Sequence, residues 1–294
     1  MNRYEVHTIK DAYTLYELKE SSTSSRVLVC PERGGIVISC MLHGTELFYL
    51  DRTTFENPDA NIRGGNPVLF PICGPVKDSV YEWNGRAYRM NQHGVARVNP
   101  WEVVSVSTEG EASVTLRLRA NESTREAYPF DFELLFTYAL VGGELHIRQT
   151  YRNAGKNGSM PFYAGFHPYF AIEGSKNIPY ETDATKYVDY NDNVEKPYSG
   201  RIDLEPLVES VCLLDAKRSE IAFPVRDGAS VRMRYDDSFK YVVIWSVKDR
   251  PFVCVEPWMA QPLEMNRREE LVMVEPGEER RANLTISLEK DEQQ

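Results

Sequence analysis

The chain contains few cysteines and lacks the motifs that most often bind metals or nucleotides. Its five cysteines are an odd number, lie far apart and form no CxxC pair, which disfavours a disulfide framework and a structural zinc site and fits a reducing cytosol. No HxH or HExxH spacing indicates a metal centre, and no GxGxxG or GxxxxGKS/T motif indicates a nucleotide site. The sequence therefore gives no support for a metal, dinucleotide or P-loop site.

Long apolar segments and an excess of positive charge are also missing. The first twenty residues carry charges throughout and lack the apolar stretch and cleavage site of a secretory signal. The longest uncharged apolar segments are far shorter than the roughly 18 residues that cross a bilayer. Lys and Arg number 34 against 44 Asp and Glu, so the net charge is −10, which disfavours nucleic acid as the main partner. We expect a soluble, cytoplasmic protein that binds neither nucleic acid nor membrane.

Alternation of apolar and polar residues is the main structural signal that the sequence does contain. Segment 113–119 alternates strictly, as a strand with one solvent-exposed face does. Segments 132–141 and 144–151 are separated by Gly142 and Gly143, and glycines reach the positive φ that short hairpin turns need. Further strands are predicted at 26–30, 36–42, 101–106, 230–235, 241–247, 252–256 and 282–288.

These short strands predict an all-β fold. Regularly spaced strands with turn residues between them are typical of a sandwich or barrel, and no alternating βαβ pattern favours a parallel sheet. A short helix is conceivable only at 267–274. No repeat or Gly/Ser-rich linker divides the chain, so we expect one domain at 1–288 followed by an acidic tail at 289–294.

Two of the five histidines stand in distinctive contexts. His93 lies in a short polar stretch, directly before Gly94 and four residues before Arg97. His167 precedes Pro168, which restricts the histidine backbone to extended conformations and excludes a helix interior. Both are predicted at loop or strand-end positions, from which side chains reach a cleft. A hydrogen-bonded core histidine is the competing interpretation for each.

A carboxylate and an arginine also stand in distinctive contexts. Glu256 closes an apolar run and precedes Pro257, which is expected to end the strand. A carboxylate at the lip of an apolar cleft tends to have a raised pKa, which suits a general base near neutral pH. Arg63 adjoins two glycines that leave room for its guanidinium to reach a polyol or a phosphate. The alternative interpretations are a solvated strand end for Glu256 and a structural turn with a solvated side chain for Arg63.

The distinctive residues lie in four motifs, IRGGNPVLFPICGP at 62–75, QHGVAR at 92–97, GFHPYF at 165–170 and VEPW at 255–258. Taken together and in this order, these motifs resemble the aldose 1-epimerase (galactose mutarotase-like) family, and most closely its hexose-6-phosphate mutarotase branch. The resemblance spans about two thirds of the chain. It implies a β-supersandwich of antiparallel sheets with an open sugar-binding cleft, and it implies no metal or organic cofactor.

The resemblance also implies roles for individual residues. His167 matches the catalytic acid of the family, Glu256 the catalytic base and His93 the second active-site histidine. The family's sugar-binding aspartate has its best match at Asp189, with Asp203 as a competitor. Substrate-binding positions of the phosphosugar branch are matched by Arg63, Gln92 and Arg97.

The implied reaction interconverts the α and β anomers of a hexose or hexose 6-phosphate. The enzyme removes the proton of the anomeric hydroxyl, protonates the ring oxygen, opens the ring and closes it on the other face, which requires both an acid and a base. Arg63 and Arg97 favour a phosphorylated sugar slightly, because arginine forks match phosphate oxygens. The net charge of −10 works against an anionic ligand.

Three other functions compete with this interpretation. A non-catalytic sugar-binding module on the same fold would need no acid and base. A glycoside hydrolase usually uses two carboxylates, whereas only Glu256 stands in a site-like motif. A His/His/Glu metal site lacks the expected spacing. The joint presence of His167 and Glu256 favours the epimerase.

Overall fold

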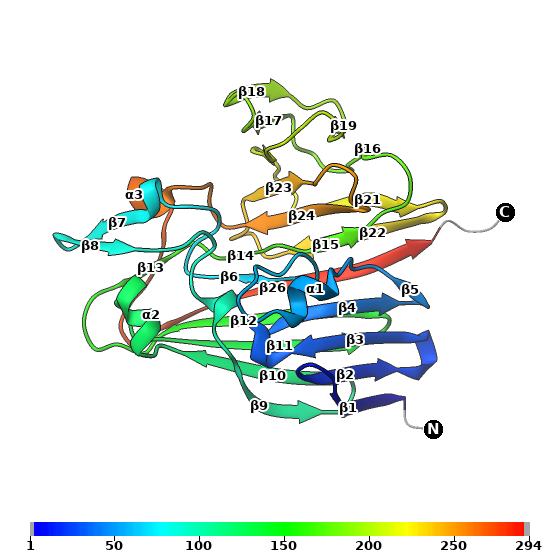
Figure 1. Ribbon diagram of the computed structural model, residues 1–294, viewed down its shortest axis with the longest axis horizontal. Helices are drawn as coiled ribbons and strands as arrows, with labels where there is room; N and C mark the ends of the chain where they lie inside the picture. The colour runs from blue at the N-terminus through cyan, green and yellow to red at the C-terminus, as the bar shows by residue number, and fades with distance from the viewer. Residues whose placement is uncertain (1–2, 291–294) are drawn as a thin grey trace.

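The chain folds into antiparallel β-sheets that pack on one another (Figure 1). The structure is a computed structural model, and it describes residues 3–290. A five-stranded sheet is formed by β1 (Tyr4–Lys10), β2 (Thr14–Glu20), β3 (Ser25–Cys30), β4 (Ile36–Leu42) and β5 (Thr45–Glu46), in that order. A seven-stranded sheet has the order β21 (Glu220–Arg226), β22 (Ala229–Tyr235), β26 (Glu279–Lys290), β12 (Glu144–Asn153), β11 (Phe132–Val141), β10 (Ala112–Arg119) and β9 (Glu102–Ser107).

A third sheet carries most of the residues singled out above. Its order is β18 (Val194–Pro197), β17 (Lys186–Asp189), β20 (Val211–Leu213), β23 (Tyr241–Trp245), β24 (Phe252–Trp258), β14 (Gly165–Phe166) and β6 (Val68–Leu69), and β15 (Tyr169–Ala171) also pairs with β24. Two-stranded pairs join β7 (Val80–Trp83) to β8 (Arg86–Arg89), β13 (Met160–Phe162) to β25 (Val272–Val274) and β16 (Asn177–Pro179) to β19 (Arg201–Asp203). The short helices are α1 (Arg52–Glu56), α2 (Glu122–Ala127) and α3 (Glu264–Arg267).

One continuous apolar core joins these sheets, and it also fixes loops of the site. The inward residues of β10 and β11 are buried at alternating positions, as the sequence pattern predicts. Phe70 is fully buried among aromatic rings, and its carbonyl accepts hydrogen bonds from the amides of Val95 and Ala96 at 2.8 and 3.1 Å. A Cβ on Gly94 would lie 2.3 Å from that carbonyl oxygen, so only glycine permits this approach. The core thereby places the 92–97 segment beside the 62–75 segment.

The structure confirms the all-β antiparallel class and the hairpin at Gly142 and Gly143, where Val141 pairs with Glu144. Three expectations are wrong. The helix expected at 267–274 instead lies at 264–267, because Arg268 takes a left-handed conformation with φ of 62°. Pro257 does not end its strand, since β24 continues to Trp258. Glu289 and Lys290 belong to β26, and residues 291–294 of the expected acidic tail lie outside the described residues.

The cysteines and the lengths of the helices complete the description of the fold. All five cysteines are free thiols and all are buried. In the stretch from residue 3 to residue 290, the helices are all too short or too polar to traverse a bilayer.

Candidate active site

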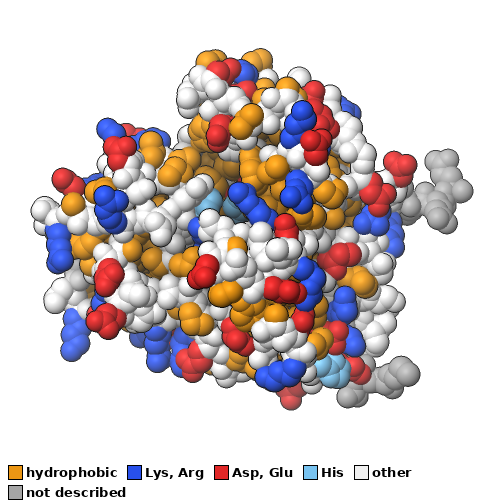
Figure 2. All heavy atoms as spheres, viewed as in Figure 1, with side chains coloured by type: hydrophobic (Ala, Val, Ile, Leu, Met, Phe, Trp, Pro, Cys, Tyr) orange, Lys and Arg blue, Asp and Glu red, His pale blue; other side chains and the backbone are white. Residues whose placement is uncertain are grey.

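A cavity of about 310 Å³ opens on the face shown in Figure 2, where histidine and basic side chains lie in a hollow. Its size falls at the lower end of the roughly 300 to 1,000 Å³ that is usual for small-molecule sites. The cavity brings together six of the seven site residues expected from the sequence. Those six residues are Arg63, Gln92, His93, Arg97, His167 and Glu256.

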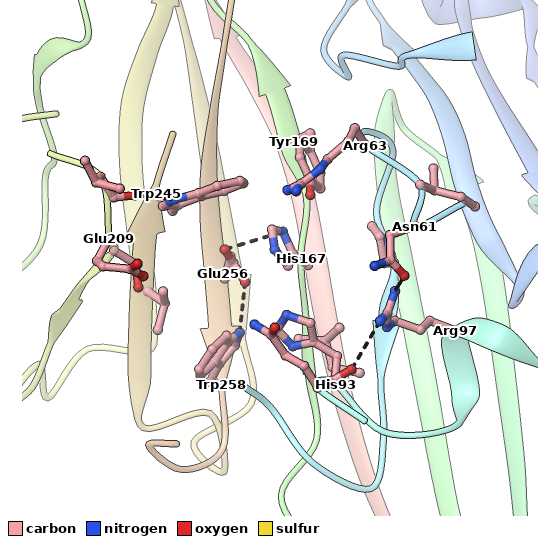
Figure 3. A pocket seen from close by; sticks show the side chains of 17 residues that line it. Asn61, Arg63, His93, Arg97, His167, Tyr169, Glu209, Trp245, Glu256 and Trp258 are labelled. Carbon is pink, nitrogen blue, oxygen red and sulfur yellow. Dashed lines mark hydrogen bonds and ion pairs between the residues drawn. The ribbon is translucent and has the colours of Figure 1, made fainter. Parts of the chain in front are cut away.

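His167 and Glu256 form the centre of the cavity (Figure 3). His167 lies between β14 and β15, and both strands pair with β24, which carries Glu256. The imidazole Nδ1 lies 3.4 Å from Oε1 of the carboxyl, and the two side chains are 12% and 2% exposed. Trp258 donates its indole N–H to the other carboxyl oxygen at 3.2 Å. Strand pairing therefore fixes the position of both groups.

Burial makes the neutral forms of both groups the favoured ones. It raises the pKa of Glu256 well above its ordinary value, against a smaller opposing effect of the Trp258 hydrogen bond. Burial also lowers the pKa of His167 to about 3, with further lowering by the nearby guanidinium groups of Arg97 and Arg63. At neutral pH the pair therefore holds one proton, and moving that proton from Glu256 to His167 leaves the proton count unchanged.

His93 is oriented as a hydrogen-bond donor. Its backbone φ is 67°, and its Nδ1 accepts a hydrogen bond from the amide of Gly74 at 3.1 Å. In a neutral imidazole the other nitrogen, Nε2, then carries the hydrogen. Burial, followed by the nearby His167 and Arg97, lowers the pKa of His93 well below its ordinary value and keeps the ring neutral. Its ring centre lies 5.3 Å from that of His167.

Two arginines form one wall of the cavity. Arg97 donates to the side-chain oxygen of Asn61 at 3.0 Å and to the backbone carbonyl of Gln92 at 3.2 Å. Arg63 lies over the Trp245 ring, with its guanidinium carbon 5.4 Å from the ring centre. Neither guanidinium forms an ion pair with any carboxylate between residues 3 and 290. Burial and the neighbouring Arg63 lower the pKa of Arg97. The wall therefore carries positive charge that no described side chain neutralises.

Three atoms near one another could be considered as metal ligands, two from cavity residues and one from Cys254, which is buried and does not line the cavity. Nδ1 of His167, Sγ of Cys254 and a carboxyl oxygen of Glu256 lie within 4.8 Å of one another. A tetrahedral zinc site holds its ligands at about 2.0 to 2.3 Å from the ion, so these side chains would have to move closer together.

Comparison with known proteins identifies the family. A sequence model described as aldose 1-epimerase matches residues 15–287. The chain belongs to the aldose 1-epimerase family. The crystal structure of the Slr1438 protein from Synechocystis sp. PCC 6803 is 32% identical, with a TM-score of 0.91 over 97% of this chain and 100% of that one.

Two further relatives are more distant. A galactose mutarotase related enzyme from Lactobacillus acidophilus shares the fold at 21% identity, with a TM-score of 0.77 over 98% of this chain and 99% of that one. A protein from Escherichia coli (strain K12), provisionally named a glucose-6-phosphate 1-epimerase, is 26% identical over 162 residues, which are 54% of this chain and 50% of that protein. The galactose mutarotase-like fold expected from the motifs is thereby confirmed.

Neither of the two aspartates that the motifs suggest for sugar binding in this aldose 1-epimerase family member lines the cavity. Asp189 is buried outside the cavity, where its carboxylate accepts hydrogen bonds from Lys196 at 2.6 Å and Asn191 at 2.7 Å. Asp203 is exposed on β19 and does not line the cavity either. The carboxylate on the wall opposite the arginines belongs to Glu209 (Figure 3).

Sequence reasoning missed Glu209, Asn61 and Trp245, which all line the cavity. Asn61 directly precedes the first motif, and its polar side chain beside Arg63 was the only local signal for it. Glu209 lies in a loop without a motif, and its place in the cavity depends on contacts with the distant segment 189–191. No local pattern could have identified it.

Proposed function

We propose that this aldose 1-epimerase family member is a mutarotase that interconverts the α and β anomers of an aldohexose 6-phosphate. The observation that carries the proposal is the contact between His167 and Glu256, whose reactive atoms lie 3.4 Å apart within the cavity. Opening a pyranose requires one group that takes the O1 proton and one that protonates O5. A binding module has no need for such a pair.

The proton shared by the pair suits this chemistry. When Glu256 is ionised and His167 is protonated, the carboxylate takes the hydrogen of the anomeric hydroxyl while the imidazolium gives its proton to O5. The C1–O5 bond breaks, a carbonyl forms at C1, and the pair is left as a neutral carboxylic acid and a neutral imidazole. This is the form that burial favours, so enclosure assists ring opening from the ion-pair form, which is reached only after the proton moves from Glu256 to His167. Rotation about C1–C2 and the reverse proton transfers then close the ring on the other face.

Other residues of the cavity have supporting roles in the proposal. His93 presents its Nε2 hydrogen, which can stabilise the negative charge that develops on a sugar oxygen. Glu209 takes the place that sequence reasoning gave to Asp189 and accepts hydrogen bonds from sugar hydroxyls. No polar contact of its side chain with residues 3–290 competes for this carboxylate.

A phosphate group on the substrate is supported by the arginine wall. Arg63 and Arg97 lie close enough to lower the pKa of Arg97, and no carboxylate of the described chain compensates them. A phosphate between the two guanidiniums would receive charge-assisted hydrogen bonds and relieve their repulsion. The free aldohexose is the second candidate, because the His167–Glu256 pair acts on the pyranose ring alone.

The test compares anomerisation rates for glucose 6-phosphate, glucose and galactose at low and physiological salt. The proposal predicts the highest kcat/KM for glucose 6-phosphate and a fall with rising ionic strength, because salt screens partly exposed charges over about 8 Å at physiological strength. Rates on the free sugars should barely respond. Equal kcat/KM for all three sugars would assign the enzyme to free aldoses.

A further inference from the structure

The backbone of Glu209 is bound by the side chain of one asparagine. Asn191 accepts hydrogen bonds at its Oδ1 from the backbone amides of Val208 and Glu209, at 3.0 and 2.9 Å. Its Nδ2 donates to the backbone carbonyl of Glu209 at 3.1 Å. Both polar backbone groups of Glu209 are therefore bound by one side chain, which follows β17 in the sequence.

Asn191 is in turn fixed by Asp189. The Asp189 carboxylate accepts hydrogen bonds from the backbone amide and from Nδ2 of Asn191, at 2.9 and 2.7 Å, and from Lys196 at 2.6 Å. Burial alone would raise the pKa of Asp189, but these hydrogen bonds outweigh it and lower the pKa. Asp189 is thus a buried, ionised anchor rather than a cavity residue.

The same loop is attached from its other side to the cavity wall. The indole N–H of Trp245 donates to the carbonyl of Val208 at 3.2 Å, and the Trp245 ring also supports the Arg63 guanidinium. Val208 is 76% exposed, so burial of its side chain does little to hold the loop. Hydrogen bonds to the backbone, and not apolar packing of Val208, fix the position of Glu209.

We propose that Asn191 is a positioning residue that holds Glu209 against the sugar hydroxyls, and that Asp189 acts by fixing Asn191. The inference rests on the proposed function, because it requires Glu209 to bind substrate. The Glu209 carboxylate is exposed and makes no side-chain hydrogen bond within residues 3–290, so its direction is set by the backbone that Asn191 binds. Releasing that backbone lets the carboxylate sample other directions and weakens substrate binding.

The experiment is a double-mutant cycle with Asn191→Ala and Glu209→Ala. Asn191→Ala should raise KM about fivefold to tenfold, equivalent to one net hydrogen bond, and leave kcat within about twofold. The double variant should show the KM of Glu209→Ala alone, because Asn191 acts only through Glu209. Glu195→Ala is the matched control, since it removes an ion pair with Lys186 on the strands beside the same turn.

Amide hydrogen exchange in segment 204–210 provides a readout that does not depend on activity. Exchange should be faster in Asn191→Ala than in the wild type and in Glu195→Ala. The inference would be overturned by unchanged amide exchange or by an unchanged KM in Asn191→Ala. It would also be overturned if the effects of the two substitutions on KM simply multiplied in the double variant. A wild type without anomerase activity would overturn the proposed function itself, whereas an active wild type with an indifferent Asn191→Ala variant overturns the inference alone.

Discussion

Replacing Glu256 by glutamine is the sharpest single perturbation of the site. Glutamine has nearly the same shape and keeps an oxygen that can accept the Trp258 indole hydrogen bond, at 3.2 Å in the wild type. It removes the carboxyl group that lies 3.4 Å from Nδ1 of His167 and that gains and loses a proton in the proposed reaction. Substrate binding should therefore survive while proton transfer does not.

The magnitude follows from the enclosure of the pair. Glu256 is 2% exposed, so water has little access to act in its place. Acid–base catalysis by one positioned side chain contributes about 100- to 10,000-fold, which corresponds to about 3 to 5 kcal/mol in the activation barrier. We expect the substitution to lower kcat by about 100- to 10,000-fold and to change KM by less than about threefold.

The thermal stability of Glu256→Gln should not fall together with its kcat. Folding raises the pKa of Glu256 above its ordinary value of 4.5, so the wild type loses free energy of unfolding as the pH rises above that value. Glutamine has no proton to lose, so the variant should be at least as stable as the wild type at pH 8 in thermal unfolding. Glu264→Gln, which alters another buried carboxyl outside the cavity, is the matched control and should keep its kcat. A Glu256→Gln variant with more than half of the wild-type kcat would refute this role of Glu256.

Four further predictions concern the cavity. Because the pKa of His167 is lowered to about 3, this histidine should give no limb near pH 6.5 in the profile of kcat/KM on free glucose, which has no group that titrates there; an NMR titration of the His167 imidazole with its midpoint near 6.5 would contradict this. Arg97→Ala should raise KM for glucose 6-phosphate about tenfold more than KM for glucose, and equal losses in steady-state assays would remove the phosphate assignment. Arg63→Lys should also raise KM for the phosphosugar, because an ammonium cannot replace a planar fork. Replacing His93 by Phe should lower kcat about 100-fold and also lower the thermal stability modestly, because the Gly74 amide loses its acceptor; an unaltered kcat in the same assay would exclude the role of His93 as a donor.

The sequence predicts the strands well because alternation is a local signal. Segments 132–141 and 36–42 agree with β11 and β4 residue for residue. The expectation that Pro257 ends β24 is wrong. A proline has no amide hydrogen, but it still fits inside a strand at a position where the partner strand needs no donor from it. Such pairing depends on distant strands and is invisible in a local window.

The site shows the same division between local and distant signals. Arg63, His93 and His167 stand in recognisable motifs, and the cavity gathers all three. The residue type of Asp189 and its order in the chain favour it as the sugar-binding aspartate. Its buried ion pair with Lys196, however, arises from the pairing of β17 with β18. Glu209 reaches the cavity only through the hydrogen bonds of Asn191, which link segments that no spacing rule connects.

The most direct test of the account is the rate of anomeric exchange of glucose 6-phosphate, measured by NMR magnetisation transfer between the α and β anomeric protons at catalytic protein concentration. The account predicts exchange well above the buffer rate for the wild type, and a rate near that of buffer for Glu256→Gln. Exchange at the buffer rate with the wild type, on glucose 6-phosphate and on glucose and galactose alike, would contradict the claim that the His167–Glu256 pair opens and closes a sugar ring.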